Sequence, residues 1–115
     1  MKSSKDVKIS VYITSYNQKE YLIESINSVL NQTLKPYEII IVDDCSRDGS
    51  QGVIREYAEK HKDLIKPFYN KENLGIPQTQ NVALGKVKGD LVCYLDGDDR
   101  FLPCKLEVEV DTYAK

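Results

Sequence analysis

The sequence has few of the residues that define a disulfide scaffold, a zinc site or a membrane span. Its three cysteines, Cys45, Cys93 and Cys104, are scattered and include no Cys-x-x-Cys pair. This pattern argues against a disulfide framework and a structural zinc site, and it is typical of reduced thiols in a cytosolic protein. The aliphatic run 39–42 is far too short for a membrane span. Residues 1–6 lack the apolar core of a signal peptide.

A strong positive charge is also missing. The 115 residues have a formal net charge of -2 and a pI near 5.4, which argues against a general nucleic-acid surface. A phosphate-bearing ligand is not excluded, because a bound metal ion can supply positive charge locally. The only histidine, His61, lies in a charged segment and indicates a solvated helix end rather than a catalytic group. The length fits one compact domain.

What the sequence does contain is an alternation of strand and helix patterns. Strands are predicted at 8–14, 38–42, 65–69 and 90–95. Helices are predicted at 18–32, about 49–61 and 76–84, and from 101 onward, with Pro103 near the first turn of the last and Asn17 as a cap of the first. This order predicts right-handed crossovers and a mostly parallel sheet flanked by helices, in a Rossmann-like α/β fold.

Polar segments follow three of the predicted strands: 15–17, 43–44 and 96–99. Ligands of parallel α/β sheets bind in the crevice beyond the carboxyl ends of the strands, where these segments should meet. The last segment contains Asp96, Asp98 and Asp99, whose crowded charges favour a divalent cation with oxygen ligands. Gly97 would let a ligand approach the backbone. An exposed acidic turn that only solubilises the loop is the alternative.

Five other residues also allow both a binding and a structural interpretation. Asp44 could accept a hydrogen bond from a base N–H, whereas Asp48 is better explained as a helix cap. Tyr16 could stack on a base or pack against the following helix. Asn73, together with Gly75, is typical of a turn before a helix.

Five ordered motifs carry a resemblance to a known family. They are Ile13–Asn17, Ser28–Thr33, Glu38–Ser50, Asn73–Gly75 and Asp96–Asp99. Together they resemble the N-terminal part of an inverting family 2 glycosyltransferase with the GT-A fold, from about residue 8 to the end of the sequence. The resemblance implies that residues 1–115 form a single domain, the nucleotide-sugar-binding half, without the acceptor-binding half.

The resemblance also implies a function for individual residues. Such an enzyme transfers a sugar from a nucleoside diphosphate donor, here most simply a UDP-sugar, to an acceptor hydroxyl with inversion. Thr14 and Tyr16 match the nucleotide-binding turn, and Asp44 matches the carboxylate that reads the base. Asp96 would lie near the ribose, and Asp98 would ligate Mn²⁺ or Mg²⁺ bridging the diphosphate. The metal would act as a Lewis acid on the departing diphosphate.

Two departures from the family pattern matter. Gln80 stands where the family often has an arginine that contacts the base or phosphate, so Gln80 is the expected substrate-binding residue there. The family's general base is an acidic residue well downstream, so no catalytic residue is assigned before Lys115. The acceptor is expected to be a saccharide or glycolipid, and the location cytoplasmic, with peripheral contact to the inner face of the membrane in the full-length protein.

Three alternatives compete with this interpretation. A sugar-phosphate nucleotidyltransferase needs a glycine-rich loop after the first strand, and residues 15–20 contain no glycine. A Mg²⁺-dependent phosphoacceptor or phosphatase-like domain also gathers aspartates at strand ends, but the pair Asp43–Asp44 fits that pattern only loosely. A nucleotide-binding module without catalytic activity remains open.

Overall fold

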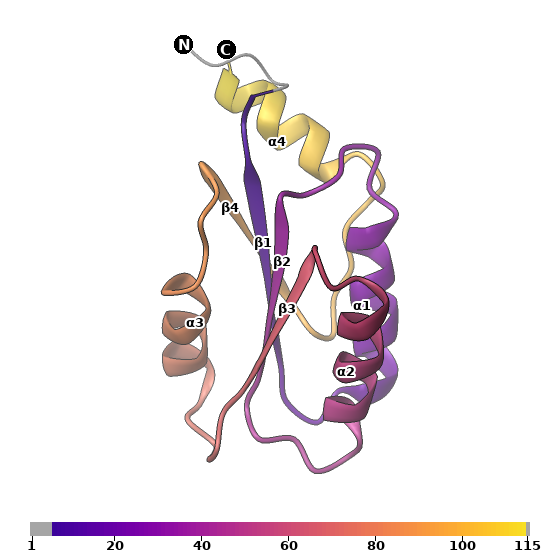
Figure 1. Ribbon diagram of the computed structural model, residues 1–115, viewed down its shortest axis with the longest axis vertical. Helices are drawn as coiled ribbons and strands as arrows, with labels where there is room; N and C mark the ends of the chain where they lie inside the picture. Colours follow the sequence, from indigo (N-terminus) through magenta and orange to yellow (C-terminus); the bar gives the residue numbers. More distant parts are fainter. Residues whose placement is uncertain (1–5, 115) are drawn as a thin grey trace.

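The chain folds into an α/β domain, described here for residues 6–114 of a computed structural model. Strands and helices alternate along the chain (Figure 1). The elements are β1 (Ile9–Ser15), α1 (Lys19–Leu30), β2 (Glu38–Asp43), α2 (Ser50–Lys60), β3 (Ile65–Tyr69), α3 (Ile76–Leu84), β4 (Leu91–Asp96) and α4 (Lys105–Ala114). The predicted alternation is therefore confirmed, and the predicted bounds of β3 and α3 coincide with the observed ones.

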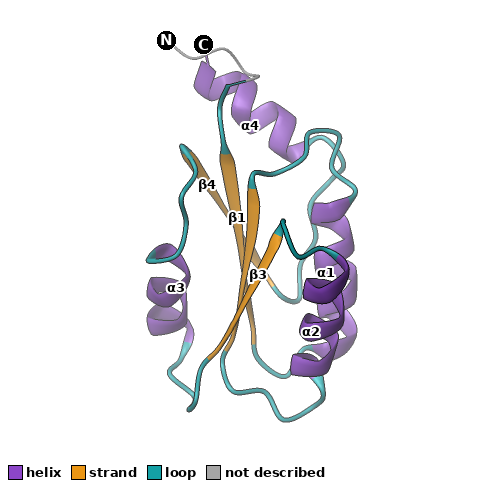
Figure 2. Cartoon of the chain, in the orientation of Figure 1, coloured by secondary structure: helices purple, strands orange, loops and turns teal. Residues whose placement is uncertain are grey.

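The four strands form one parallel sheet in the order β3-β2-β1-β4. Helices α1 and α2 cover one face of it, and α3 lies on the other (Figure 2). Because side chains alternate along a strand, Val11 and Ile13 of β1 face the core under α1 and α2, whereas Tyr12 packs with Ile40 and Ala83 beneath α3. The predicted α/β architecture with a parallel sheet is thus confirmed.

The final helix begins later than the sequence predicts, at Lys105 rather than near Phe101. The backbone of the intervening segment is bound to the end of α1 instead. The Phe101 N–H donates to the Ser28 hydroxyl at 3.0 Å, and the Pro103 carbonyl accepts from the Thr33 N–H at 2.8 Å. Pro103 therefore lies just ahead of the first turn of α4.

Cys45, Cys93 and Cys104 are all free thiols. Across residues 6–114, no helix combines the length and the apolarity needed to cross a bilayer.

Candidate nucleotide-binding site

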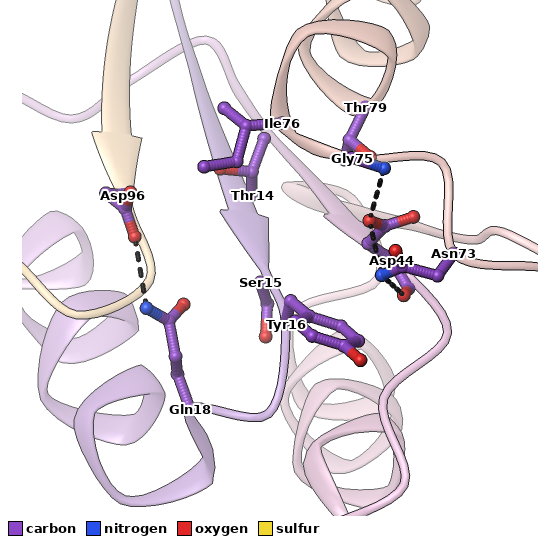
Figure 3. A pocket seen from close by; sticks show the side chains of 10 residues that line it. All are labelled: Thr14, Ser15, Tyr16, Gln18, Asp44, Asn73, Gly75, Ile76, Thr79 and Asp96. Carbon is purple, nitrogen blue, oxygen red and sulfur yellow. Dashed lines mark hydrogen bonds between the residues drawn. The ribbon is translucent and has the colours of Figure 1, made fainter.

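One pocket lies at the carboxyl edge of the sheet, where β1 and β4 end and the loop after β3 leads into α3 (Figure 3). Its volume is about 220 Å³. The register of β1 and β4 places Thr14 directly beside Asp96. The lining residues are Thr14, Ser15, Tyr16, Gln18, Asp44, Asn73, Gly75, Ile76, Thr79 and Asp96.

Four of the six residues predicted to bind substrate or metal therefore come together in one pocket: Thr14, Tyr16, Asp44 and Asp96. The other two lie outside its lining. Gln80 is half-buried on α3, and Asp98 faces a neighbouring hollow. That hollow is lined by Tyr21, Glu24, Asp98, Asp99 and Arg100.

Asp44 is the most heavily hydrogen-bonded group of the site. Its side chain is buried, and each carboxylate oxygen accepts two N–H groups. The donors are Asn70 Nδ2 at 2.9 Å and Leu74 N at 2.8 Å on Oδ1, and Asn73 Nδ2 and Gly75 N, both at 2.9 Å, on Oδ2. Burial alone would raise the pKa of Asp44, but these hydrogen bonds hold it below its ordinary value. Asp44 thus fixes the loop that forms one wall of the pocket.

Asp96 forms the opposite wall at the end of β4. Its Oδ1 accepts from Gln18 Nε2 at 3.4 Å, and its Oδ2 accepts from the Tyr94 hydroxyl at 3.3 Å. Figure 3 shows Asp96 and Gln18 facing each other on one side of Thr14, with Asp44 on the other side. The two carboxylates that the sequence singled out therefore flank the end of β1.

The structure explains the glycine at position 97 differently from the sequence, which suggested that it lets a ligand approach the backbone. A Cβ at this position would lie 2.8 Å from the Thr14 carbonyl oxygen and 2.9 Å from Gln18 Oε1. The glycine therefore allows the acidic loop to approach the protein's own backbone, and the Gly97 N–H donates to the Thr14 carbonyl at 2.8 Å. On the other side of the loop, the Ser25 hydroxyl of α1 donates to the Gly97 carbonyl at 3.0 Å.

The turn after β1 also differs from its prediction. Asn17 does not cap α1: Gln18 occupies that position, and Asn17 has a left-handed backbone with φ of 51°. Its side-chain oxygen instead accepts from the Arg47 N–H at 2.9 Å, because the turn packs against the loop after β2. Asp48 is likewise not the N-cap of α2, a position that Gly49 occupies. Its carboxylate nevertheless accepts from the N–H of the first residue of each helix, Ser50 of α2 and Lys19 of α1, both at 3.0 Å.

The acidic loop brings hard oxygen ligands together. A hydrogen bond between the Asp98 and Asp96 side chains raises the pKa of Asp98, and repulsion between the two like charges adds to this effect. Within residues 6–114, no group of three or more His, Cys, Asp or Glu side chains is arranged to hold a metal ion. Any cation bound here would therefore need ligands from a substrate or water besides these carboxylates.

Sequence reasoning missed part of the pocket. It assigned no role to Gln18 or Thr79, and for Asn73 and Gly75 it preferred a turn to a position in the wall of the crevice. Gly75 is indeed the residue before α3, with φ of 90°, yet both also line the pocket. One feature of the sequence could have identified these residues. An Asn-x-Gly turn directly precedes a predicted helix, in a chain whose ligand was already expected at the carboxyl edge of the sheet.

A parallel sheet flanked by helices, with a pocket at its carboxyl edge, defines the class of α/β domains that bind ligands beyond the carboxyl ends of their strands. The comparisons then identify the family: a sequence model of glycosyl transferase family 2 matches residues 10–115, so the chain belongs to that family. TuaG of Bacillus subtilis, a glycosyltransferase named for teichuronic acid biosynthesis, is 39% identical over 103 residues. The match covers 90% of this chain and 40% of that protein, so the chain spans well under half of its relative.

Solved structures show the same fold. The crystal structure of S. aureus TarS 1–349 in complex with UDP is 32% identical and superposes with a TM-score of 0.79, over 89% of this chain and 30% of the other. GalNAc-T7, solved with UDP, GalNAc and Mn²⁺, is 28% identical with a TM-score of 0.71, over 79% and 18%. The fold is thus that of GT-A glycosyltransferases, as the resemblance predicted.

Proposed function

We propose that this chain binds a nucleoside diphosphate sugar together with a divalent cation, as the donor-binding part of an inverting glycosyltransferase. One observation carries the proposal: Thr14, Tyr16, Asp44 and Asp96 meet in one pocket, with Asp98 on the adjoining loop. The similar TarS and GalNAc-T7 structures both contain UDP, which supports a uridine nucleotide as the first ligand to test.

The pocket residues divide the work according to their chemistry. The Tyr16 side chain is 48% exposed at the pocket and offers a ring face on which a base can stack. Asp44 faces the base side and fixes the loop through Asn73 and Gly75. Asp96 would accept hydrogen bonds from the ribose on its side of the same pocket. A carboxylate at neutral pH accepts hydrogen bonds and does not donate them.

The donor set of the acidic loop fits a metal ion. Asp96 and Asp98 offer carboxylate oxygens, which Mn²⁺ and Mg²⁺ accept, and a diphosphate can complete the coordination. GalNAc-T7 contains Mn²⁺. We assign Asp98 as the protein's ligand to the cation, which would supply Lewis-acid stabilisation of the departing diphosphate.

The acceptor and the setting follow from the same family membership. We propose a saccharide or glycolipid acceptor in polysaccharide biosynthesis, the process for which TuaG is named. Such an enzyme would act in the cytoplasm, at the inner face of the membrane. The general base that deprotonates the acceptor would be an acidic residue outside this sequence, and nucleic acid is not a proposed partner.

Calorimetric titration of UDP, GDP and dTDP, with and without Mn²⁺, tests the proposal. We expect one of the three to bind, and to bind much more tightly with the metal. Asp98→Asn should remove the dependence on metal, because it removes a charged ligand. Asp63→Asn, at an exposed position away from the pocket, is the matched control and should leave the dependence intact.

Tyr16→Ala provides a second, independent arm of the same experiment. Loss of the stacked ring should weaken nucleotide binding by about 5- to 150-fold, while the metal is still required. Failure of every nucleotide to bind, or binding indifferent to metal, would contradict the proposed function. A common loss of folding in Asp98→Asn and Tyr16→Ala would show that these side chains are structural.

A further inference from the structure

Tyr94 links β1 to the first carboxylate of the acidic loop. Its hydroxyl lies 2.9 Å from Thr14 Oγ1 and donates to Asp96 Oδ2 at 3.3 Å. Gln18 Nε2 donates to the other oxygen of Asp96 at 3.4 Å. The carboxylate is therefore held from both sides by groups of the protein before any ligand arrives.

The number of hydroxyl protons determines which group donates in each hydrogen bond between Thr14, Tyr94 and Asp96. A phenol carries a single proton, and Tyr94 donates it to Asp96. Thr14 must therefore be the donor in its contact with Tyr94, so its own proton is also used. What Thr14 has left for the pocket is lone pairs, and Asp96 likewise offers only lone pairs. At Thr14 and Asp96, the pocket therefore accepts hydrogen bonds and does not donate them.

The Tyr94 ring is fixed independently of its hydroxyl. It packs against the Tyr12 ring on the adjacent strand, with 4.9 Å between ring centroids and 31° between planes. The two tyrosines are register partners in the β1–β4 pair. Thr14 is itself buried, at 6% exposure. The geometry of the hydroxyl is thus set by packing, and removal of the hydroxyl alone should leave the ring in place.

We propose that Tyr94 is a positioning residue that orients Asp96 and commits the Thr14 proton, so that this part of the pocket selects a ligand presenting hydroxyl donors, such as a ribose. The inference rests on the proposed nucleotide-binding function. It adds a residue from outside the pocket lining and a chemical reason for the selectivity of the pocket.

Calorimetry with UDP and its 2′,3′-dideoxy analogue, both with Mn²⁺, tests this inference. Wild-type protein should favour UDP by about 10- to 100-fold, because the analogue leaves the acceptors of Thr14 and Asp96 without donors. Tyr94→Phe should narrow that preference by about three- to tenfold, through weaker UDP binding and little change for the analogue. Thermal unfolding of each variant without nucleotide reports any general loss of structure.

Tyr12→Phe is the matched control. It deletes the same chemical group from the other ring of the pair, and the Tyr12 hydroxyl has no hydrogen bond to any of residues 6–114. This variant should keep the full preference for UDP. The inference is overturned if Tyr94→Phe leaves the preference unchanged or weakens both ligands equally. If wild-type protein binds neither ligand, the proposed function fails, and the inference fails with it.

Discussion

The two ends of β2 each place a buried carboxylate among hydrogen-bond donors, yet of the two only Asp44 lines the pocket at the carboxyl edge of the sheet. Glu38 begins the strand and is fully buried, whereas Asp44 follows its last residue and lines the crevice. Both have a pKa below the ordinary value, because hydrogen bonds outweigh the burial that would raise it. A buried carboxylate with a lowered pKa therefore does not by itself mark a binding site.

The difference lies in what the donors belong to. Glu38 accepts from the Ser10 hydroxyl at 2.7 Å, from the Lys88 N–H at 2.5 Å and from Lys66 Nζ at 3.3 Å, which connects three strands and the segment before β4. The four N–H groups that donate to the Asp44 carboxylate come instead from one loop, which forms a wall of the pocket. The hydrogen bonds of Glu38 thus hold the strands together at the amino edge of the sheet. The hydrogen bonds of Asp44 instead fix the loop that forms a wall of the pocket at the carboxyl edge.

Glu38→Ala should have the largest effect. It leaves the Ser10 hydroxyl and the Lys88 N–H without their acceptor and creates a cavity, so the free energy of unfolding should fall by about 3 kcal/mol. Urea unfolding would measure this loss. Nucleotide affinity of the fraction that remains folded should be unchanged, and a change in affinity would remove the distinction between the two ends.

Asp44→Asn should have a smaller effect on stability and a larger one on binding. It turns one acceptor oxygen into a donor facing two N–H groups, at a cost of about 2 kcal/mol. Because the loop loses its anchor, nucleotide affinity should fall as well, as measured by calorimetry. Exposed Asp63→Asn should change neither. A loss of affinity at wild-type stability would indicate that Asp44 acts only by contacting the ligand.

The sequence predicted the fold well because its elements have strong local patterns. The apolar run 39–42 and the spacing of Leu22, Ile26 and Val29 identify a buried strand and an amphipathic helix without tertiary information. The predicted start of α4 was wrong because the backbone groups of Phe101 and Pro103 form hydrogen bonds with residues in and just after the end of α1. No local sequence pattern indicates this tertiary contact.

The position of the candidate site at the carboxyl edge of the sheet could be predicted from the sequence. The hydrogen bonds that hold its side chains in place could not. Parallel topology alone brings Thr14 and Asp96 to one edge, so their convergence could be expected. The side chains that support them could not, since Tyr94 looks like any apolar strand residue and Gln18 like an ordinary helix start. Only the strand register and the folded turn show that both reach Asp96.

The glycines at the two ends of β4 allow the smallest and most closely matched comparison. A Cβ on Gly89 would lie 2.6 Å from the Lys8 carbonyl oxygen, and one on Gly97 would lie 2.8 Å from that of Thr14. Each alanine substitution must push backbone apart, so each should cost about 1 to 2 kcal/mol in thermal or urea unfolding. Gly52→Ala, where a Cβ meets nothing within 4 Å in helix α2, should instead stabilise by about 0.5 to 1 kcal/mol.

The two alanine substitutions should differ in their effect on nucleotide affinity, even though they should lower the free energy of unfolding by similar amounts. Gly97→Ala moves the acidic loop away from β1 and should weaken metal-dependent nucleotide binding. Gly89→Ala disturbs only the amino edge, where the Gly89 N–H donates to the Ser10 hydroxyl at 2.8 Å, and should leave binding intact. Equal effects on binding would mean that β4 shifts as a rigid unit, so that the amino edge also controls the position of Asp96.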